Sequence, residues 1–428
     1  MADFIEINAD FHLHGLYSMA VSNNMVPSKI GEQAPLKGLQ LVGTADILNA
    51  KWIKLIKEQL KPIDKDASIF EHSNGTKFIL QTEVEDNTRT HHIILFPSMS
   101  KVEEVKEKLT SKCKDLDVEG RPKLHIGPEE LAEICISSGC MIGPSHAFTP
   151  WTSIFKAFNS IKQCYGSQAD KIHFLELGLS ADTNMADRIS ELHRLTFLSN
   201  SDAHSPWPNK MGREFNTVSV QDISYEEIEK AIKREGGRKF VMNVGFNPLE
   251  GKYHKTRCLN CLTFFQPKDA EVYRWRCPSC KSSIKKGVDA RIDELADIPE
   301  GQHPNHRPPY IYTIPLSEII AVAIGVKQAY SQKVQAVWEK FTHKFGNEIT
   351  ILLHTPISEL KEIEPKTAEM VHLFRNNEFR YIPGGGGVYG IPVPPGKKLE
   401  INIWSNGKVQ KLADEKKESG QKSLDEFF

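Results

Sequence analysis

Short apolar runs alternate with amphipathic stretches over residues 1–250 of the chain. The apolar runs are "LQLVGTADI", "KFILQTEVE", "THHIILF", "CMIGPSHAF", "IHFLELGLS" and "LTFLSNSDAH". The stretches between them have helical periodicity, as in "KVEEVKEKLTSKC", "GPEELAEICISSG" and "DISYEEIEKAIKREGG". Strands that alternate with helices predict an α/β layer structure, with parallel strands as the default.

Polar residues of metal-binding types gather where the predicted strands end. They are Asp10, His12, His14, Asp46, Glu83, His91, His92, His146, Glu176, Asp202 and His204. In α/β sheets and barrels, ligands collect at the carboxyl ends of the strands, where the loops diverge and leave a cleft. Residues two apart on an extended segment share a face, so Asp202 and His204 could reach one ion together. We therefore expect a single pocket lined by His, Asp and Glu.

A mixed set of imidazoles and carboxylates suits Zn²⁺, Mn²⁺ or Fe²⁺ better than Mg²⁺ alone, because imidazole favours the borderline-soft ions. Carboxylates can also bridge two ions. Two metals about 3.5 to 4 Å apart lower the pKa of a bound water and hold the attacking and leaving oxygens of a phosphoester. The pattern therefore indicates hydrolysis of a phosphate ester.

Three positions allow more than one interpretation. Asp46 is either a ligand or the cap of the helix expected after it, and Glu176 is either a ligand or a substrate contact. His91 and His92 are adjacent and point to opposite faces of a strand, so at most one should be a ligand. We favour His92, because it directly precedes the apolar "IILF".

Four cysteines form two Cys-x-x-Cys pairs, Cys258 with Cys261 and Cys277 with Cys280, separated by the fifteen residues 262–276. This spacing is typical of a zinc ribbon, in which each pair aims two thiolates at one tetrahedral ion. A site closed by four protein ligands has no open position for water. We therefore expect a structural Zn²⁺ that folds the module and takes no part in catalysis.

Basic and aromatic residues surround the cysteine pairs. They are Lys252, Tyr253, His254, Arg257, Arg274, Trp275, Lys285 and Lys286. Basic side chains neutralise phosphates and aromatic rings stack on unpaired bases, so this stretch favours DNA binding over a merely solvated basic face.

Composition excludes several classes of protein. The chain has 428 residues, 39% of them hydrophobic and 25% charged, which is an ordinary globular balance with room for two or three domains. The formal net charge is -1, so nucleic-acid binding would depend on local patches. No basic n-region opens the sequence and no window approaches the ~20 apolar residues of a membrane span. We expect an intracellular protein that does not bind membranes.

Several motifs resemble those of a known superfamily. In order, "DFHLH", "GTAD", "TEVE", "HHIILF", "GPSHAFTPW", "ELGLSADTNMAD" and "SNSDAHSPWPNKMGREFN" are similar to the polymerase and histidinol phosphatase (PHP) superfamily of metal-dependent phosphoesterases. The last four of these, with the segment that follows, resemble the endonuclease Q family. That resemblance covers nearly the whole chain.

The resemblance implies an α/β fold with a PHP-type (β/α)₇-like barrel, a small four-Cys zinc module and a mainly helical C-terminal domain. It divides the chain into a PHP domain (1–248), a zinc-ribbon-like domain (249–290), a helical DNA-binding domain (291–410) and a tail (411–428). It also implies two or three catalytic divalent ions, Zn²⁺, Mn²⁺ or Mg²⁺. The metal ligands that it implies are His12, His14, Glu83, His92, His146, Asp202 and His204.

Two positions depart from the usual superfamily pattern. Gly15 stands where a Ser often follows the second His, and Asp46 is followed by "ILNA" without a His. These departures make Asp46 the least certain member of the predicted metal set.

The family nicks DNA on the 5′ side of deaminated bases, such as uracil, hypoxanthine and xanthine, and of abasic sites. The implied function is a DNA repair endonuclease acting on damaged duplex or single-stranded DNA, with Asp202, His204 and Glu83 in catalytic roles. Candidate substrate contacts are Glu176, Phe148, Trp151, Tyr165, Lys252, Tyr253 and His254. The aromatic members of this set could stack on a base that has left the helix.

The C-terminal tail ends in "QKSLDEFF", with Gln421, Leu424, Phe427 and Phe428 spaced to put Leu and Phe on one side of a short helical turn. This resembles the PIP box that docks on PCNA-type sliding clamps. The alternative is a hydrophobic plug that binds the protein's own surface. A clamp partner favours an archaeal-type setting, with a monomer in the cytoplasm near the nucleoid.

Two other functions stay open. One is a PHP-type phosphomonoesterase such as histidinol phosphatase, which has no evident use for a zinc ribbon or a clamp-binding tail. The other is a clamp-tethered DNA-binding adaptor without catalysis, against which the nearly complete ligand set argues.

Overall fold

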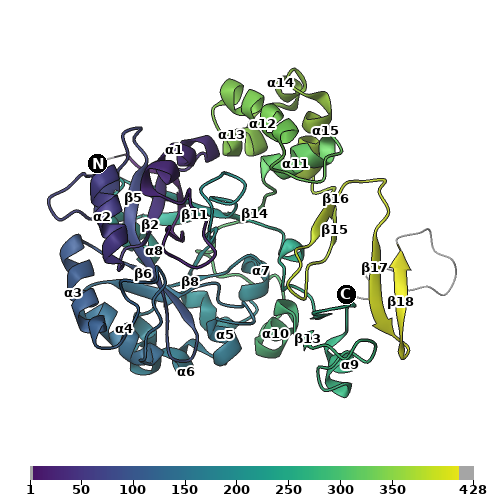
Figure 1. Cartoon of the computed structure of the whole chain (residues 1–428), viewed down its shortest axis with the longest axis horizontal. Coiled ribbons are helices and arrows are strands. Elements are labelled where there is room, and N and C mark those ends of the chain that lie inside the picture. Colours follow the sequence, from purple (N-terminus) through teal and green to yellow (C-terminus); the bar gives the residue numbers. More distant parts are fainter. Residues whose placement is uncertain (1–2, 414–428) are drawn as a thin grey trace.

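In a computed structural model, which describes residues 3–413, the chain up to residue 250 and one later strand form a strongly curved sheet with helices packed around it (Figure 1). The strands are β1 (Ile5–Asp10), β2 (Leu41–Asp46), β3 (Lys61–Pro62), β4 (Ile69–Glu71), β5 (Lys77–Glu85), β6 (His91–Leu95), β7 (Met141–Pro144), β8 (Phe174–Glu176), β9 (Thr196–Leu198), β10 (Phe215–Val220), β11 (Lys239–Gly245) and β14 (Tyr310–Tyr312). The largest sheet follows the order β14-β11-β10-β1-β2-β5-β4-β3, and β6 and β7 continue it from β5. The pair β8-β9 lies between β7 and β11, so the strands nearly close into a barrel.

The helices of this half connect successive strands. They are α1 (Pro27–Lys37), α2 (Ala50–Gln59), α3 (Met99–Thr110), α4 (Pro128–Ser137), α5 (Ile154–Ala157), α6 (Ile161–Tyr165), α7 (Thr183–Ala186) and α8 (Tyr225–Lys233), with short 3-10 helices η1 (Gly166–Lys171), η2 (Ser190–Arg194) and η3 (Pro248–Glu250). Asn49 caps α2 by accepting hydrogen bonds from the backbone N–H groups of Lys51 and Trp52. The capping role considered for Asp46 therefore belongs to Asn49.

Strand directions differ from the parallel default. The pairs β1-β2, β2-β5 and β8-β9 are parallel, whereas β1-β10, β10-β11, β5-β6 and β6-β7 are antiparallel. Between β5 and β6 the connection is too short for a crossover helix. It is a tight turn in which Asp86 Oδ1 accepts from the backbone N–H groups of Thr88 and Thr90 at 2.8 and 2.9 Å. The sequence could not show this, because strands of both kinds are buried on both faces.

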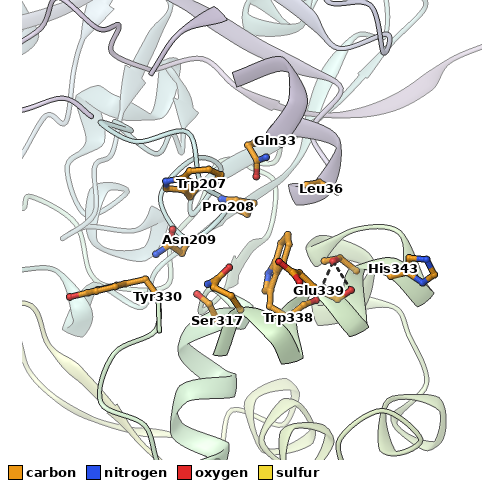
Figure 2. Close-up of a pocket in the computed structure, with 12 residues that line it drawn as sticks. Gln33, Leu36, Trp207, Pro208, Asn209, Ser317, Tyr330, Trp338, Glu339 and His343 are labelled. Atoms are coloured by element: carbon orange, nitrogen blue, oxygen red, sulfur yellow. Dashed lines mark hydrogen bonds between the residues drawn. The ribbon is translucent and has the colours of Figure 1, made fainter. Parts of the chain in front are cut away.

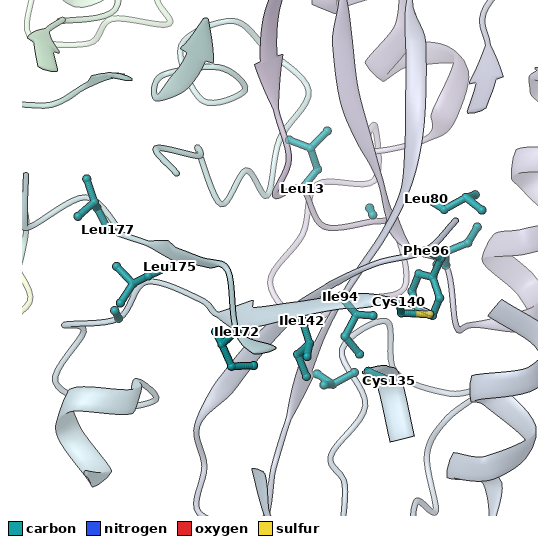
Figure 3. Close-up of a cluster of buried hydrophobic side chains, with 14 of the residues drawn as sticks. Leu13, Leu80, Ile94, Phe96, Cys135, Cys140, Ile142, Ile172, Leu175 and Leu177 are labelled. Atoms are coloured by element: carbon teal, nitrogen blue, oxygen red, sulfur yellow. The ribbon is translucent and has the colours of Figure 1, made fainter. Parts of the chain in front are cut away.

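The sheet separates two buried clusters. Along β5, Phe78 and Leu80 pack toward the helices, whereas Ile79 joins the cluster on the other face. The same alternation recurs in β6 with Ile94 on the helix side, where Figure 3 shows it near Ile142. Residues on both faces are therefore excluded from water, which gives the cleft a rigid support.

Beyond the barrel the chain builds a small unit around the four cysteines. It contains β12 (Arg257–Cys258), α9 (Pro267–Val272), β13 (Ile284–Lys285) and α10 (Val288–Leu295). A helical unit follows, shown in green at the top of Figure 1, with α11 (Leu316–Ala323), α12 (Gln332–Phe345), α13 (Glu348–Leu353), α14 (Ile357–Lys361) and α15 (Pro365–Arg375).

The last described segment is made of strands, and part of it returns to the cysteine unit. These strands are β15 (Arg380–Ile382), β16 (Ile391–Val393), β17 (Glu400–Ser405) and β18 (Lys408–Ala413). Trp404 of β17 stacks on Phe265 with ring centroids 5.8 Å apart and meets Tyr273 edge-on at 5.4 Å. The domain boundaries predicted at residues 248, 290 and 410 stay a proposal.

Within residues 3–413, the helices are all too short or too polar to cross a membrane. The predicted clamp-binding residues Gln421, Leu424, Phe427 and Phe428 lie outside the described residues. The monomeric state and the cellular location stay predictions.

Candidate metal centre

A cleft of about 470 Å³ opens at the end of the barrel where the predicted ligands gather. His12 and His14 follow β1, Glu83 lies near the end of β5, and Asp202 follows β9. His146 follows β7 and forms part of the cleft lining. The volume falls within the range of about 300 to 1,000 Å³ that is usual for ligand sites.

At this end of the barrel, three groups of described side chains have ligand atoms within 4.8 Å of one another. They are His12, His14 and Glu83; His14, Asp202 and His204; and Glu83, His91 and His146. Glu83 and His14 each belong to two groups. Since a carboxylate can bridge two ions, this geometry is compatible with two or three neighbouring metals.

Glu83 lies at the centre of the cluster. Its Oε1 is 3.0 Å from His146 Nε2 and 3.2 Å from His91 Nδ1, and its Oε2 is 3.3 Å from His14 Nε2. Burial alone would raise the pKa of the Glu83 carboxyl, but the charges of His91 and His12 hold that pKa well below its usual range. Glu83 is therefore an ionised carboxylate shared by several imidazoles.

Carboxylates behind the cluster fix the orientation of the imidazole rings. His12 Nδ1 contacts Glu176 Oε1 at 2.9 Å, His14 Nδ1 contacts Asp46 Oδ1 at 3.3 Å, and His91 Nε2 contacts Glu85 Oε2 at 3.0 Å. Histidines that bind metals usually use their second nitrogen in this way. Glu176 and Asp46 thus contact the nitrogens of His12 and His14 that face away from the cluster. Neither carboxylate belongs to one of the three groups.

Buried polar atoms without partners show that the cluster fits metal ions. Four buried atoms have no hydrogen-bond partner among the described residues: His12 Nε2, His14 Nε2, Asp202 Oδ1 and His146 Nδ1. Leaving such atoms unpaired costs about 1 to 3 kcal/mol each. The first three atoms point into the same small volume, since Asp202 Oδ1 is 3.2 Å from His14 Nε2 and 3.7 Å from His12 Nε2. Divalent ions would satisfy them.

The backbone is strained at the same place. Asp202 has φ 48°, His146 has φ 27°, and Ala45, next to Asp46, has φ 60°. Non-glycine residues in this region cost on the order of 1 to 3 kcal/mol, and they concentrate at functional sites. Here the strain aims side chains from different strands into one cleft.

His91, and not His92, lies in the cluster, which corrects the choice made from the sequence. His92 points to the other side of β6, where its Nδ1 is 2.7 Å from Tyr165 Oη and its Nε2 is 3.0 Å from Asp86 Oδ2. The apolar residues after His92 were a poor guide because every residue of β6 is buried, so the pattern does not distinguish the two faces.

Three predicted substrate contacts lie elsewhere. Tyr165 is fully buried against His92, and Phe148 is 3% exposed and stacks on Phe155. His254 is buried with its Nδ1 3.2 Å from the backbone oxygen of Ser180. Phe148 and Tyr165 belong to the apolar core, because large aromatic side chains in apolar motifs usually pack inward.

Other predicted contacts do line the cleft. Trp151, 41% exposed, meets the Tyr253 ring edge-on with centroids 6.3 Å apart. Lys285 Nζ lies 3.6 Å from the centre of the Trp151 ring, and Lys252 Nζ lies 5.3 Å from that of Tyr253. Two aromatic rings, each with a cation over it, therefore form one wall of the cleft.

Sequence reasoning missed three cations and one tyrosine that line the cleft. They are Arg121, Lys210, Arg213 and Tyr389. Arg121 Nη1 is 3.2 Å from Glu83 Oε2, and Arg213 Nη1 donates to Tyr389 Oη at 3.3 Å. No local motif marks these residues, although Lys210 and Arg213 follow the "SNSDAHS" segment closely. They give the cleft a positive rim that suits an anionic substrate.

Tyr389 reaches the cleft because a glycine run packs tightly against residues 249–258. A Cβ on Gly384 would lie 2.3 Å from the Gly251 oxygen, and one on Gly390 would lie 2.1 Å from the Leu249 oxygen. Both N–H groups donate to backbone oxygens of that segment, at 2.7 and 2.9 Å. The run therefore serves close backbone packing.

The four cysteines come together as a separate cluster. All four sulfurs lie within 4.8 Å of one another, with Cys258 to Cys280 at 3.5 Å and Cys261 to Cys277 at 3.6 Å. Four thiolates around one zinc at ~2.3 Å would be ~3.8 Å apart, so the donor set and its size fit that ion. None of the four is in a disulfide.

The fold and the two clusters define the class of protein: an α/β-barrel metalloprotein with a separate four-cysteine site and a helical unit. A family model described as MJ0043 C-terminal domain matches residues 315–378, which is the helical unit. An uncharacterized protein of Methanocaldococcus jannaschii, MJ0043, is 50% identical over 250 residues, or 57% of this chain. That match spans 31% of the relative's length.

Two solved structures match over almost their whole length. The lesion-specific endonuclease PfuEndoQ of Pyrococcus furiosus has a TM-score of 0.86 and 47% identity, with 92% of this chain and 96% of that chain covered. An endonuclease Q bound to a 27-mer duplex with an abasic lesion at the active site has a TM-score of 0.88 and 47% identity, with 92% and 97% covered. The chain belongs to the endonuclease Q family, and the predicted fold class is confirmed.

Proposed function

We propose that this protein is a metal-dependent DNA repair endonuclease that hydrolyses the phosphodiester on the 5′ side of deaminated bases and abasic sites. The observation that carries the proposal is the Glu83-centred cluster at the floor of a positively rimmed cleft. The relatives support it, since one is described as lesion-specific and another was solved with a lesion-containing duplex. A phosphomonoesterase would need neither the wide cleft nor the aromatic wall.

The proposed metal ligands are His12, His14, Glu83, His91, His146, Asp202 and His204. Divalent ions held there would lower the pKa of a water and stabilise negative charge on the phosphate. The carboxylates of Glu176, Asp46 and Glu85 keep the imidazole rings oriented. The protein thus supplies a preorganised site that needs little rearrangement during the reaction.

Cations along the rim would hold the scissile phosphate. Arg121 is fixed by Glu83 at 3.2 Å, so its guanidinium is positioned at the cluster. Arg213 is fixed by Tyr389 and by the Ser201 oxygen, to which its Nε donates at 3.1 Å. Because these side chains are already ordered, they bind phosphate with a small loss of conformational entropy.

The aromatic wall is the proposed place for a damaged base. An enzyme that inspects a base inside a duplex has to extrude it, which costs a few kcal/mol and less for a mispaired or missing base. Trp151 and Tyr253 could stack on the extruded base or sugar. The four-Cys unit, with its structural Zn²⁺, would then hold Tyr253 and Lys252 in register with the barrel.

A cleavage assay tests the function. Purified protein with Mn²⁺, Zn²⁺ or Mg²⁺ is incubated with duplexes that carry uracil, hypoxanthine, xanthine, an abasic site or no lesion, and the cut is mapped. We expect lesion-dependent nicks on the 5′ side. Release of phosphate from histidinol phosphate without nicking would establish the phosphomonoesterase instead. Lesion-dependent binding without any cut would establish the adaptor.

We also propose a PCNA-type clamp as partner, on the sequence of residues 421–428 alone. Deletion of these residues should abolish binding to a sliding clamp and leave nicking of short oligonucleotides intact. Equal loss of both activities would reject the proposal and favour the internal plug.

A further inference from the structure

A second cavity, of about 640 Å³, lies where the helical unit meets the barrel (Figure 2). One wall comes from α1, a second from the loop after β9 at Trp207 and Asn209, and a third from α11 and α12. It is larger than the metal cleft and takes no part in the proposed chemistry.

Aromatic rings form much of this cavity. Trp207 is 43% exposed and Tyr330 is 69% exposed, although both are large rings that usually pack inside. Trp338 is held in place, since its Nε1 donates to Glu348 Oε2 at 2.9 Å. Glu348 in turn accepts from Lys37 Nζ at 2.7 Å, so the wall is rigid before any ligand arrives.

One residue of the cavity wall has a buried hydroxyl without a partner within the described chain. Ser317 is 2% exposed, lines the cavity, and its Oγ has no hydrogen-bond partner within the described chain. A buried hydroxyl without a hydrogen bond is costly, so a hydrogen bond from a polar group of a ligand would be favourable here. The carboxamides of Gln33 and Asn209 line the cavity as well and can act as both donors and acceptors.

The charges exclude an anion. Among the described lining residues the ionisable side chains are Glu339, His343 and Tyr330, and none is Lys or Arg. A phosphate would have no cation to pair with and would be repelled by Glu339. Rings for stacking, amide groups and a free hydroxyl instead suit an uncharged planar heterocycle with a hydrogen-bonding edge, which is the chemistry of a nucleobase.

One loop joins this cavity to the metal cleft. Asp202 and Arg213 line the cleft, whereas Trp207 and Asn209, between them in sequence, line the cavity. Lys37 Nζ donates to the Pro208 oxygen at 3.1 Å and so ties the middle of the loop to α1. A strand held by the rim cations could therefore place a neighbouring base on the far side of the same loop.

We propose that the cavity is a second nucleobase site, which takes an unpaired base of the DNA other than the one at the aromatic wall of the cleft. This rests on the proposed endonuclease function. Stacking on aromatic side chains contributes about 5- to 150-fold in affinity per base. The site would hold the strand open beside the lesion and keep the loop of Asp202 in one position.

A fluorescence scan tests the proposal. 2-Aminopurine replaces successive bases on each strand around a uracil, and binding is followed in the Asp202→Asn background so that the strands stay intact. We expect quenching at a discrete position away from uracil, relieved by Trp207→Ala and by Ser317→Leu, which fills the cavity. Affinity for the duplex should fall by roughly 5- to 150-fold in Trp207→Ala.

Trp151→Ala is the matched control, since Trp151 is as exposed as Trp207 but lies in the cleft. It should leave the distant quenching intact. If wild-type protein nicks uracil duplexes but no position away from uracil responds to Trp207→Ala, the second site is rejected while the endonuclease stands. Adenosine or uridine alone could bind instead, with this binding lost in Trp207→Ala, while the duplex scan shows no response. In that case the ligand is a free nucleoside, and the proposal is likewise rejected.

Discussion

The two metal-binding clusters of this chain are built in opposite ways. The four cysteines lie within residues 258–280 and meet through two short turns. The barrel ligands extend from His12 to His204 and meet only when the sheet has formed. Cys258 and Cys277 are fully buried, whereas the side chains of Asp202 and His204 are about a third exposed, at 32% and 34%. A closed site stabilises a fold, and an open site admits water and substrate.

The largest effect should come from removing one ligand of the closed four-cysteine site. Cys277→Ser removes one of four thiolates, and because metal binding and folding of such a unit are one process, we expect a loss on the order of 5 kcal/mol in the unit's free energy of unfolding. Metal analysis should show one zinc fewer per chain, and thermal unfolding should gain an early transition. Equal loss of the barrel metals would contradict the independence of the two clusters.

Next in size is the loss of a ligand from the open site. Asp202→Asn keeps the shape of the side chain but removes its charge, so nicking should fall by about 1,000-fold, measured under single-turnover conditions. Binding of lesion-containing duplex should persist, because Arg213 and Lys252 are untouched. A variant that cuts at the wild-type rate would remove Asp202 from the metal centre.

A pair of variants on β6 decides which of its faces carries the ligand. His91→Ala should reduce nicking by about 100-fold and lower the metal content, with little loss of stability. His92→Ala should leave metal content unchanged but cost about 2 to 4 kcal/mol, because it deprives Tyr165 and the buried Asp86 of their partner. The reverse outcome would show that His92, the residue favoured from the sequence, is the ligand.

That pair also marks the limit of prediction from sequence. Local spacing was sufficient for the cysteine cluster and for His12 with His14, which lie two apart on one extended segment. It was not sufficient for β6, since a strand buried on both faces has no polar side to set its orientation. The barrel as a whole could be predicted from alternation and motif order, but the strand directions could not.

Residues from distant segments were the hardest to predict. Tyr389 enters the cleft from beyond the helical unit because glycines let its segment approach residues 249–258. Tyr165 and Phe148 were expected at the rim because they are aromatic, but both lie in the core. The side to which an aromatic ring points depends on tertiary packing, which no short motif encodes.

The smallest effect should come from replacing Glu176, the carboxylate that contacts His12 Nδ1 on the side away from the cluster. Glu176→Gln keeps an acceptor for His12 Nδ1 and for the backbone N–H of His146, which lies 2.7 Å from Glu176 Oε2, but removes the charge that orients the His12 ring. We expect about a 10-fold loss of metal affinity in the barrel, read by metal titration of nicking, and a full rate at saturating metal. Glu129→Gln is the control, because Glu129 also accepts from a backbone N–H, that of Ser167 at 2.6 Å, but lies far from the cleft. If excess metal failed to restore the rate, Glu176 would contact the substrate, as one interpretation of the sequence held. Among residues 3–413, no carboxylate is seen to hydrogen-bond to the four sulfurs, so the zinc content of that site should be the same in both variants.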